Sequence, residues 1–262
     1  EMCIRDSFIL TFFTASIVLE NFLTSYKTRL EEINILKDQE NYRREFLGNV
    51  SHELKTPLFT IQGYILTLIE GALKDKKVRG KYLRRSAKGV DRLISIVKDL
   101  DLITQFESGI KTVDKTDFNI YELIENVYDL MEFESEKNNT KLLVYNENNT
   151  PVIVNADKER ILQVLTNLVV NSIKYGKEGG YTKVKVEEYD KDRIIVRVKD
   201  NGEGIDDDHL PRLFERFYRI DKNRSRKKGG SGLGLSIVKH IIEAHQEQIF
   251  VVSKIGQGTE FS

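Results

Sequence analysis

The chain has 262 residues, with 41 basic and 41 acidic side chains and a formal net charge of zero. This balance provides no overall attraction to nucleic acid, so we expect no nucleic-acid partner. A single cysteine, Cys3, excludes an internal disulfide framework and a cysteine-based zinc site.

The N-terminal segment differs in character from the rest of the chain. Residues 2–7 read Met-Cys-Ile-Arg-Asp-Ser, which matches the translation of a common transposon-type sequencing adapter, so we interpret residues 1–7 as adapter-derived. The apolar run at residues 8–19 is shorter than the roughly 20 residues that cross a bilayer. We interpret residues 8–25 as a partial transmembrane helix rather than a short buried helix, with the basic residues that follow on the cytoplasmic side of an inner membrane.

Residues 26–107 have the pattern of long amphipathic helices. We expect a signalling helix at 26–45 and, overall, two helices at 26–72 and 79–107 around a short connection. One hairpin cannot cover its own apolar stripe, so two copies should pair as a four-helix bundle in a homodimer. The apolar positions are Val50, Leu54, Leu58, Ile61, Ile65 and Leu68 on the first helix, and Tyr82, Val90, Leu93, Val97 and Leu100 on the second.

A histidine followed directly by a carboxylate stands out on the first helix, in Ser51-His-Glu-Leu-Lys-Thr-Pro57. At neutral pH an ordinary imidazole is largely unprotonated and nucleophilic, and Glu53 is placed to orient the ring of His52 or to accept its proton. Thr56 follows one helical turn later on the same face. An isolated pair of this kind would usually be a surface feature of a bundle helix, so its meaning depends on the downstream motifs. Pro57 should bend the helix.

The region from 113 onwards reads as a mixed sheet backed by helices at about 121–137, 158–175 and 232–246. Asp157 is placed to cap the second of these helices. Asn167, Asn171 and Lys174 recur along one face of it, where two amides and an ammonium can point into one pocket. An amide oxygen suits Mg²⁺ and a lysine suits a phosphate.

Two glycine-rich segments follow this helix. Strand-like alternation at Val184–Val186 and Ile194–Val198 leads into Asp200-Asn-Gly-Glu-Gly204. The glycines permit the backbone to approach a ligand closely, and Asp200 can accept a hydrogen bond from the exocyclic amine of adenine. A plain hairpin turn is the alternative interpretation of this segment. Lys227-Lys-Gly-Gly-Ser-Gly-Leu-Gly-Leu235 then opens a helix, which favours anion binding. It is neither a P-loop nor a dinucleotide motif. The basic loop at 219–228 could cover a triphosphate or be an ordinary solvated loop.

Taken in order, these motifs resemble the sensor histidine kinases of bacterial two-component systems, and the resemblance covers residues 40–262. Ser51–Pro57 resembles the H box, Asn167–Tyr175 the N box, Asp200–Gly204 the G1 box, Leu213–Tyr218 the F box and Gly230–Leu235 the G2 box, followed by the short glycine motif at Gly256–Thr259. The unbroken His-Glu-x-x-Thr resembles the phosphate-sensor-like group of membrane kinases.

This resemblance implies an α+β fold. A helical hairpin at 46–110 forms the dimeric four-helix bundle, and an α/β-sandwich ATP-binding domain of the GHKL type occupies 111–262. The sequence stops at Ser262, within an expected final strand, so we interpret the C-terminus as truncated. His52 is then the phosphoacceptor, Glu53 its acid–base partner, and Thr56 a residue that supports removal of phosphate from the partner.

The resemblance also implies the cofactors and their contacts. ATP and Mg²⁺ are expected, with Asn171 as the metal ligand and Asp200 as the adenine contact. The other residues expected to line the pocket are Asn167, Lys174, Tyr175, Gly202, Gly204, Arg219, Gly230, Gly232, Leu233, Gly234 and Thr259.

The chain has no Asp-centred receiver domain, so the aspartyl acceptor should be a separate response regulator. Two rival interpretations remain. A gyrase-like or chaperone-like ATPase shares the nucleotide motifs but lacks a histidine-bearing hairpin. A non-catalytic sensor that binds nucleotide and docks a partner would be expected to have lost His52, Asn171 or Asp200, and all three are present. We interpret His209, His240 and His245 as structural.

Overall fold

The computed structural model describes residues 2–107, 113–146, 150–190, 193–220 and 230–262, and for residues 2–19 it describes the backbone alone. Its contacts divide the chain into two units, Glu1–Thr56 and Pro57–Ser262, which are described separately. The first unit is helical over its described residues, as part of α1 (Met2–Ile69). Within the described part of the chain, no helix has a stretch both long and apolar enough to cross a membrane. The bend predicted at Pro57 stays a prediction, although α1 does continue through this residue.

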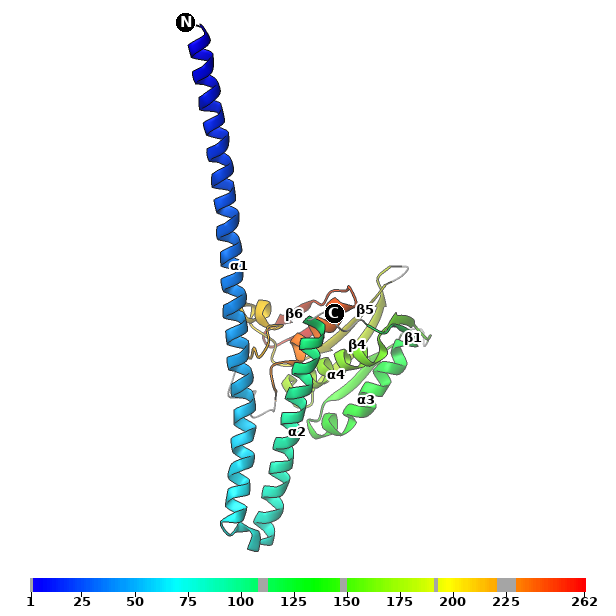
Figure 1. Ribbon diagram of the computed structural model, residues 1–262. Coiled ribbons are helices and arrows are strands. Elements are labelled where there is room, and N and C mark those ends of the chain that lie inside the picture. The colour runs from blue at the N-terminus through cyan, green and yellow to red at the C-terminus, as the bar shows by residue number, and fades with distance from the viewer. Residues whose placement is uncertain (1, 108–112, 147–149, 191–192, 221–229) are drawn as a thin grey trace. The chain divides into compact units, whose positions relative to one another are not determined.

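The second unit begins with a helical hairpin, as the sequence predicted (Figure 1). The end of α1 is followed by η1 (Ala72–Lys74) and α2 (Lys76–Glu107). The connection lies earlier in the chain than predicted, because α1 ends at Ile69 rather than at residue 72 and α2 begins at Lys76 rather than at residue 79. Gly71 adopts φ 134°, which ends α1, and the Asp75 carboxylate accepts hydrogen bonds from the backbone N–H groups of Lys77 at 2.9 Å and Val78 at 3.3 Å, so α2 starts earlier than residue 79.

Close contacts hold the hairpin together near its turn. The rings of Tyr64 and Tyr82 stack with centroids 5.1 Å apart, and Gly89 lies so near Ile61 that a Cβ there would come within 2.6 Å of its Cγ1. Leu68 of the predicted stripes is buried, as is Ile96 on α2, which was not predicted, whereas several other stripe members stay exposed in the single chain. The exposed members are Leu58, Ile65, Val90 and Val97. The hairpin therefore leaves apolar surface uncovered.

A five-stranded sheet forms the centre of the rest of the unit, in the order β2-β4-β5-β7-β6. Its strands are β2 (Lys141–Tyr145), β4 (Tyr181–Glu188), β5 (Ile194–Asp200), β6 (Val251–Lys254) and β7 (Gly258–Phe261). Among the strand pairs described in this sheet, β2–β4 is parallel and the others are antiparallel. Val184, Val198 and Phe261 are paired across adjacent strands, and all three are buried. A separate antiparallel pair joins β1 (Thr116–Asn119) to β3 (Ile153–Ala156).

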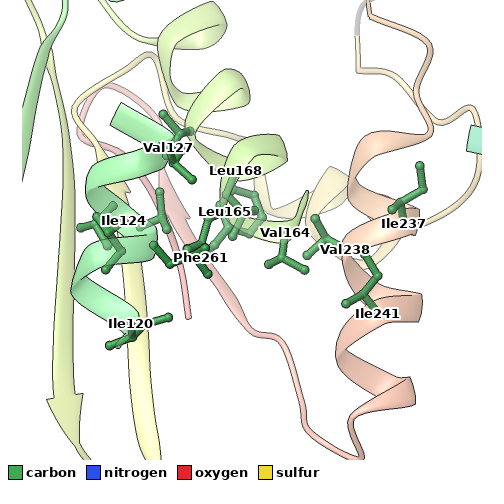
Figure 2. Close-up of a cluster of buried hydrophobic side chains, with 14 of the residues drawn as sticks. Ile120, Ile124, Val127, Val164, Leu165, Leu168, Ile237, Val238, Ile241 and Phe261 are labelled. Atoms are coloured by element: carbon green, nitrogen blue, oxygen red, sulfur yellow. The ribbon is translucent and has the colours of Figure 1, made fainter. Parts of the chain in front are cut away.

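Helices cover one face of this sheet (Figure 1). They are α3 (Ile120–Lys137), α4 (Lys158–Tyr175) and α6 (Gly234–Ala244), and their apolar faces meet Phe261 in one core (Figure 2). The predicted bounds of α4 are confirmed, as is its cap: the Asp157 carboxylate accepts from the Arg160 N–H at 3.1 Å. Leu102 and Ile103, near the end of α2, belong to the same core.

Candidate active site

His52 lies on α1 with its side chain exposed, and Glu53 beside it is half-buried. The Thr56 hydroxyl donates a hydrogen bond to the His52 backbone carbonyl at 3.2 Å, the usual back-bond of a helical threonine. The α-helical backbone through His52 keeps Thr56 one turn away, as predicted. These residues belong to the first unit, and the predicted nucleotide contacts all belong to the second.

The N-box residues lie on α4. Its other side is fixed by buried residues such as Leu168, Val169 and Ser172, whose hydroxyl pairs with that of Thr182 on β4. This orientation leaves Asn167, Asn171 and Lys174 half-buried. Burial lowers the pKa of the Lys174 ammonium, the nearby Glu134 carboxylate opposes that shift, and Arg92 adds to it.

Asp200 ends β5 with its carboxylate held by backbone donors. Its Oδ1 accepts from the N–H of Gly202 at 2.8 Å and from that of Thr259 at 3.2 Å. Burial raises the pKa of this carboxyl above its usual value, and the two hydrogen bonds partly offset the shift. Among the described residues no donor reaches Oδ2. Asp200 is therefore a fixed, mostly buried acceptor with one oxygen available.

The glycines after Asp200 are required by close backbone packing. A Cβ on Gly202 would lie 2.6 Å from the Tyr175 carbonyl oxygen, and one on Gly204, where φ is +74°, would lie 2.1 Å from the Lys254 carbonyl oxygen. Gly258 packs equally tightly against the backbone carbonyl of Asp200. These contacts bring the ends of α4, β5 and the β6–β7 turn together. The sequence motif at 256–259 marked this turn without indicating what it touches.

The second glycine loop packs between Phe217 and α4. The Phe217 N–H donates to the Gly232 carbonyl at 2.9 Å, and a Cβ on Gly232 would come within 2.8 Å of the Phe217 Cα. Gly234 begins α6 beside Asn167, whose Oδ1 would be 3.4 Å from a Cβ at that position. The loop and the N box are therefore adjacent, although they lie far apart in sequence.

Contacts within the protein position the other predicted pocket residues. The Leu233 side chain is fully buried in the core, so any ligand contact would come from its backbone. Thr259 supplies its backbone N–H to Asp200, while its hydroxyl pairs with that of Ser253 at 2.8 Å. Tyr175 remains partly exposed, with its hydroxyl 3.7 Å from the Cβ position of Gly230. Arg219 is half-buried, and the rest of the basic loop, at 221–229, lies outside the described residues.

Sequence reasoning missed Ser253 and Asp99. The Ser253 hydroxyl accepts from the Ile205 N–H at 2.8 Å and so ties β6 to the turn that follows Gly204. Asp99, on α2, forms a hydrogen bond with Ser231 of the glycine loop, and burial raises the pKa of its carboxyl to about 6. No local signal marks either residue, because both act through contacts with distant segments.

This geometry agrees with the families that the chain matches. The His Kinase A (phospho-acceptor) domain matches residues 42–109, and the histidine kinase-, DNA gyrase B-, and HSP90-like ATPase matches residues 156–262. A phosphoacceptor domain followed by such an ATPase domain defines the histidine kinase class. The described residues contain no group of three or more His, Cys, Asp or Glu side chains that could hold a metal ion.

Similarity to individual proteins extends across both domains. Over 223 residues the chain is 36% identical to the sensor histidine kinase WalK of Bacillus subtilis (strain 168), a match that covers 85% of this chain and 36% of that protein. Over 241 residues it is 35% identical to the sensor protein kinase WalK of Staphylococcus aureus, covering 91% of this chain and 57% of that one. The chain belongs to the two-component sensor histidine kinases, and it spans between a third and three fifths of the length of these relatives.

Solved structures give the same assignment. Histidine kinase AdeS of Acinetobacter baumannii superposes with a TM-score of 0.64 at 26% identity, covering 80% of this chain and 95% of that chain. Histidine kinase ThkA, in a complex with the response regulator protein TrrA, also gives a TM-score of 0.64, at 28% identity, covering 83% of this chain and 59% of that chain. The fold class predicted from the sequence, a helical hairpin followed by an α/β ATP-binding domain, is confirmed.

The packing around Gly204 predicts a difference between two alanine substitutions. Gly204 and Gly256 share a positive φ, at +74° and +80°, but only Gly204 has backbone atoms where the new Cβ would go. Both variants carry left-handed strain of about 1–2 kcal/mol, and Gly204→Ala adds a steric cost of about 1–3 kcal/mol. Urea unfolding should therefore show Gly204→Ala to be the less stable of the two. Equal losses of unfolding free energy would contradict the close packing.

Proposed function

We propose that this chain is the signalling core of a sensor histidine kinase that transfers the terminal phosphoryl group of ATP to His52 and then to an aspartate of a separate response regulator. The observation that carries the proposal is an exposed His52, followed by Glu53, in a phosphoacceptor domain on the same chain as an ATPase domain of the matching class. The non-catalytic alternative requires loss of residues that this chain retains.

The chemistry follows from the side chains. The neutral His52 imidazole attacks the terminal phosphorus, a nitrogen–phosphorus bond forms, and the bond to the ADP oxygen breaks. Glu53 takes the ring proton released as the nitrogen becomes substituted. The phosphoryl group then passes to the regulator's carboxylate, the nitrogen–phosphorus bond breaks, and Glu53 returns the proton to the ring of His52. The relative ThkA was solved in a complex with a response regulator, which supports a partner of this type.

Within the ATPase domain, the available Oδ2 of Asp200 accepts a hydrogen bond from the adenine amine. The tightly packed turns at Gly202 and Gly204 bring the chain close to the base and sugar, while Lys174 and the backbone of the loop at 230–234 meet the phosphates. Asn167 and Tyr175 flank these groups. Asn171 would hold Mg²⁺, which would supply charge neutralisation during the transfer. The related kinase ShkA was solved in a complex with AMPPNP, which supports a nucleotide here.

The assembly follows from the uncovered apolar surface of the hairpin. Leu58, Ile65, Val90 and Val97 become buried when a second copy completes a four-helix bundle, so the chain is a homodimer; a monomer in sedimentation at micromolar concentration would refute this. Residues 8–25 form part of a membrane anchor in the inner membrane, with the catalytic region in the cytoplasm. Recovery of the full chain in the membrane fraction, and loss of that partition when residues 8–25 are deleted, tests the anchor.

Autophosphorylation tests the central proposal. The full chain is incubated with Mg²⁺ and ATP labelled on its terminal phosphate. We expect an acid-labile, alkali-stable label on the wild type and none on His52→Ala, because phosphohistidine has that stability pattern and no other acceptor is proposed. A label that persists in His52→Ala would place the acceptor elsewhere, and an unlabelled wild type that binds ATP would favour the non-catalytic sensor.

Thr56→Ala is the matched variant on the same helix face. The chain resembles the phosphate-sensor-like group, in which this threonine supports phosphatase activity, so Thr56→Ala should keep the His52 label. It should also slow removal of phosphate from a phosphorylated response regulator. Unchanged dephosphorylation would refute the role assigned to Thr56.

Asp200→Asn separates stability from nucleotide binding. The raised pKa means that the protonated carboxyl is favoured in the folded state, so the stability contribution is present at low pH and is lost as pH rises through the folded pKa. At neutral pH the variant should therefore unfold at the same or a higher urea concentration. Its amide nitrogen faces the adenine amine, so AMPPNP binding should weaken about 10- to 100-fold.

The exposed Asp207→Asn serves as the control, because it removes one charge without touching the pocket. In the wild type, affinity should rise with pH through the titration of Asp200, as the acceptor ionises. If Asp200→Asn binds AMPPNP as tightly as the wild type does, Asp200 does not accept a hydrogen bond from adenine.

A further inference from the structure

His245 ends α6 as a buried side chain with both ring nitrogens engaged. Nδ1 lies 2.7 Å from the Ile241 carbonyl oxygen, and Nε2 lies 3.0 Å from the backbone nitrogen of Asp157. A carbonyl only accepts and an amide N–H only donates, so the proton must sit on Nδ1 and the lone pair on Nε2. The two partners specify one neutral tautomer of the ring.

The Nε2 partner is the residue that caps α4. In a capping box, the side chain three residues into the helix reaches back to accept from the N–H of the capping residue. Here that position is Arg160, which has no acceptor, and its own N–H donates to the Asp157 carboxylate. His245 fills the missing acceptor role from another helix. A residue at the end of α6 therefore supplies the acceptor for the capping residue of α4.

This contact fixes the register between the two helices. Gly234, at the start of α6, lies beside Asn167 on α4, and His245, at the end of α6, meets Asp157 at the start of α4, so the helices run antiparallel. Between these points Val164 of α4 lies toward Val238 and Ile241 of α6, in the same apolar core (Figure 2). Apolar packing is non-directional and tolerates small shifts, whereas a hydrogen bond at the far end does not.

We propose that His245 is a positioning residue for the nucleotide site, because it holds the glycine loop at the start of α6 in register with Asn167 and Asn171 on α4. The inference rests on the proposed nucleotide-binding function. His245 lies at the opposite end of α6 from the loop and acts through the position of that helix, without touching the nucleotide.

Two substitutions of His245 distinguish the hydrogen bond made by Nδ1 from the one made by Nε2. The Asn amide nitrogen replaces Nδ1 and keeps the bond to Ile241, but its side chain is too short to reach Asp157. The longer Gln places an amide oxygen near the position of Nε2, where it can accept from the Asp157 N–H. In the full chain, His245→Asn should bind AMPPNP with Mg²⁺ about 3- to 10-fold more weakly than the wild type, and His245→Gln should recover most of that loss.

A double variant distinguishes positioning from simple capping. Arg160→Glu places an acceptor at the capping-box position, so in the His245→Asn background it satisfies the Asp157 N–H from within α4. This change should restore the urea midpoint without restoring AMPPNP affinity, because the link to α6 is still missing. The double variant also keeps the test usable if His245→Asn alone folds poorly.

The outcomes are distinct. Recovery of affinity in the double variant, wild-type affinity in His245→Asn, or equal weakness of the Asn and Gln variants would each overturn the positioning role while leaving the proposed function intact. A wild type that fails to bind AMPPNP would overturn both. Weakened binding in His245→Asn and in the double variant, together with recovery in His245→Gln, supports the proposal.

Discussion

Burial of α4 between the sheet and its neighbouring helices is the constraint on which the rest of the ATPase domain depends. Leu165, Leu168 and Val169 are almost inaccessible to water, and burying side chains of this size stabilises a fold by about 1.5–3 kcal/mol each. That packing fixes the rotation of α4 about its own axis. Once the apolar stripe faces the sheet, the asparagines and the lysine lie on another side of the helix, where Asn167 is adjacent to Gly234 at the start of α6.

The hairpin and the ATPase domain handle apolar surface differently. The ATPase domain encloses its core within one chain, and its buried polar groups are tied down in pairs, such as Ser172 with Thr182. The hairpin buries Leu68 and Ile96 but leaves much of its stripe in contact with water. A bundle helix of this kind is stable only with more partners than one hairpin supplies. The enclosed core of the ATPase domain is typical of a ligand-binding domain, and the exposed apolar stripe of the hairpin is typical of a domain that packs against another helical partner.

Periodicity and capping chemistry predicted most elements because these signals are local. The bounds of α4 and its cap at Asp157 were visible in the sequence, as was the strand pair that leads to Asp200. Contacts between distant segments were not visible. The sequence did not indicate that the Leu233 side chain fills the core, or that the Thr259 amide donates to Asp200. Ser253 had no signal at all, since its role exists only once the β6–β7 turn meets the segment after Gly204. The assignments of the individual site residues remain predictions.

The position of β7 has a consequence for how the chain reaches this fold during synthesis. β7 follows β6 in sequence, yet it lies between β5 and β6 in the sheet, and its Phe261 pairs with Val198 more than sixty residues earlier. The hairpin depends on contacts that are local in sequence and form once α2 has left the ribosome, whereas β5 and β6 cannot be joined in the sheet until β7 has emerged. The hairpin is therefore complete in the nascent chain before the sheet of the ATPase domain is.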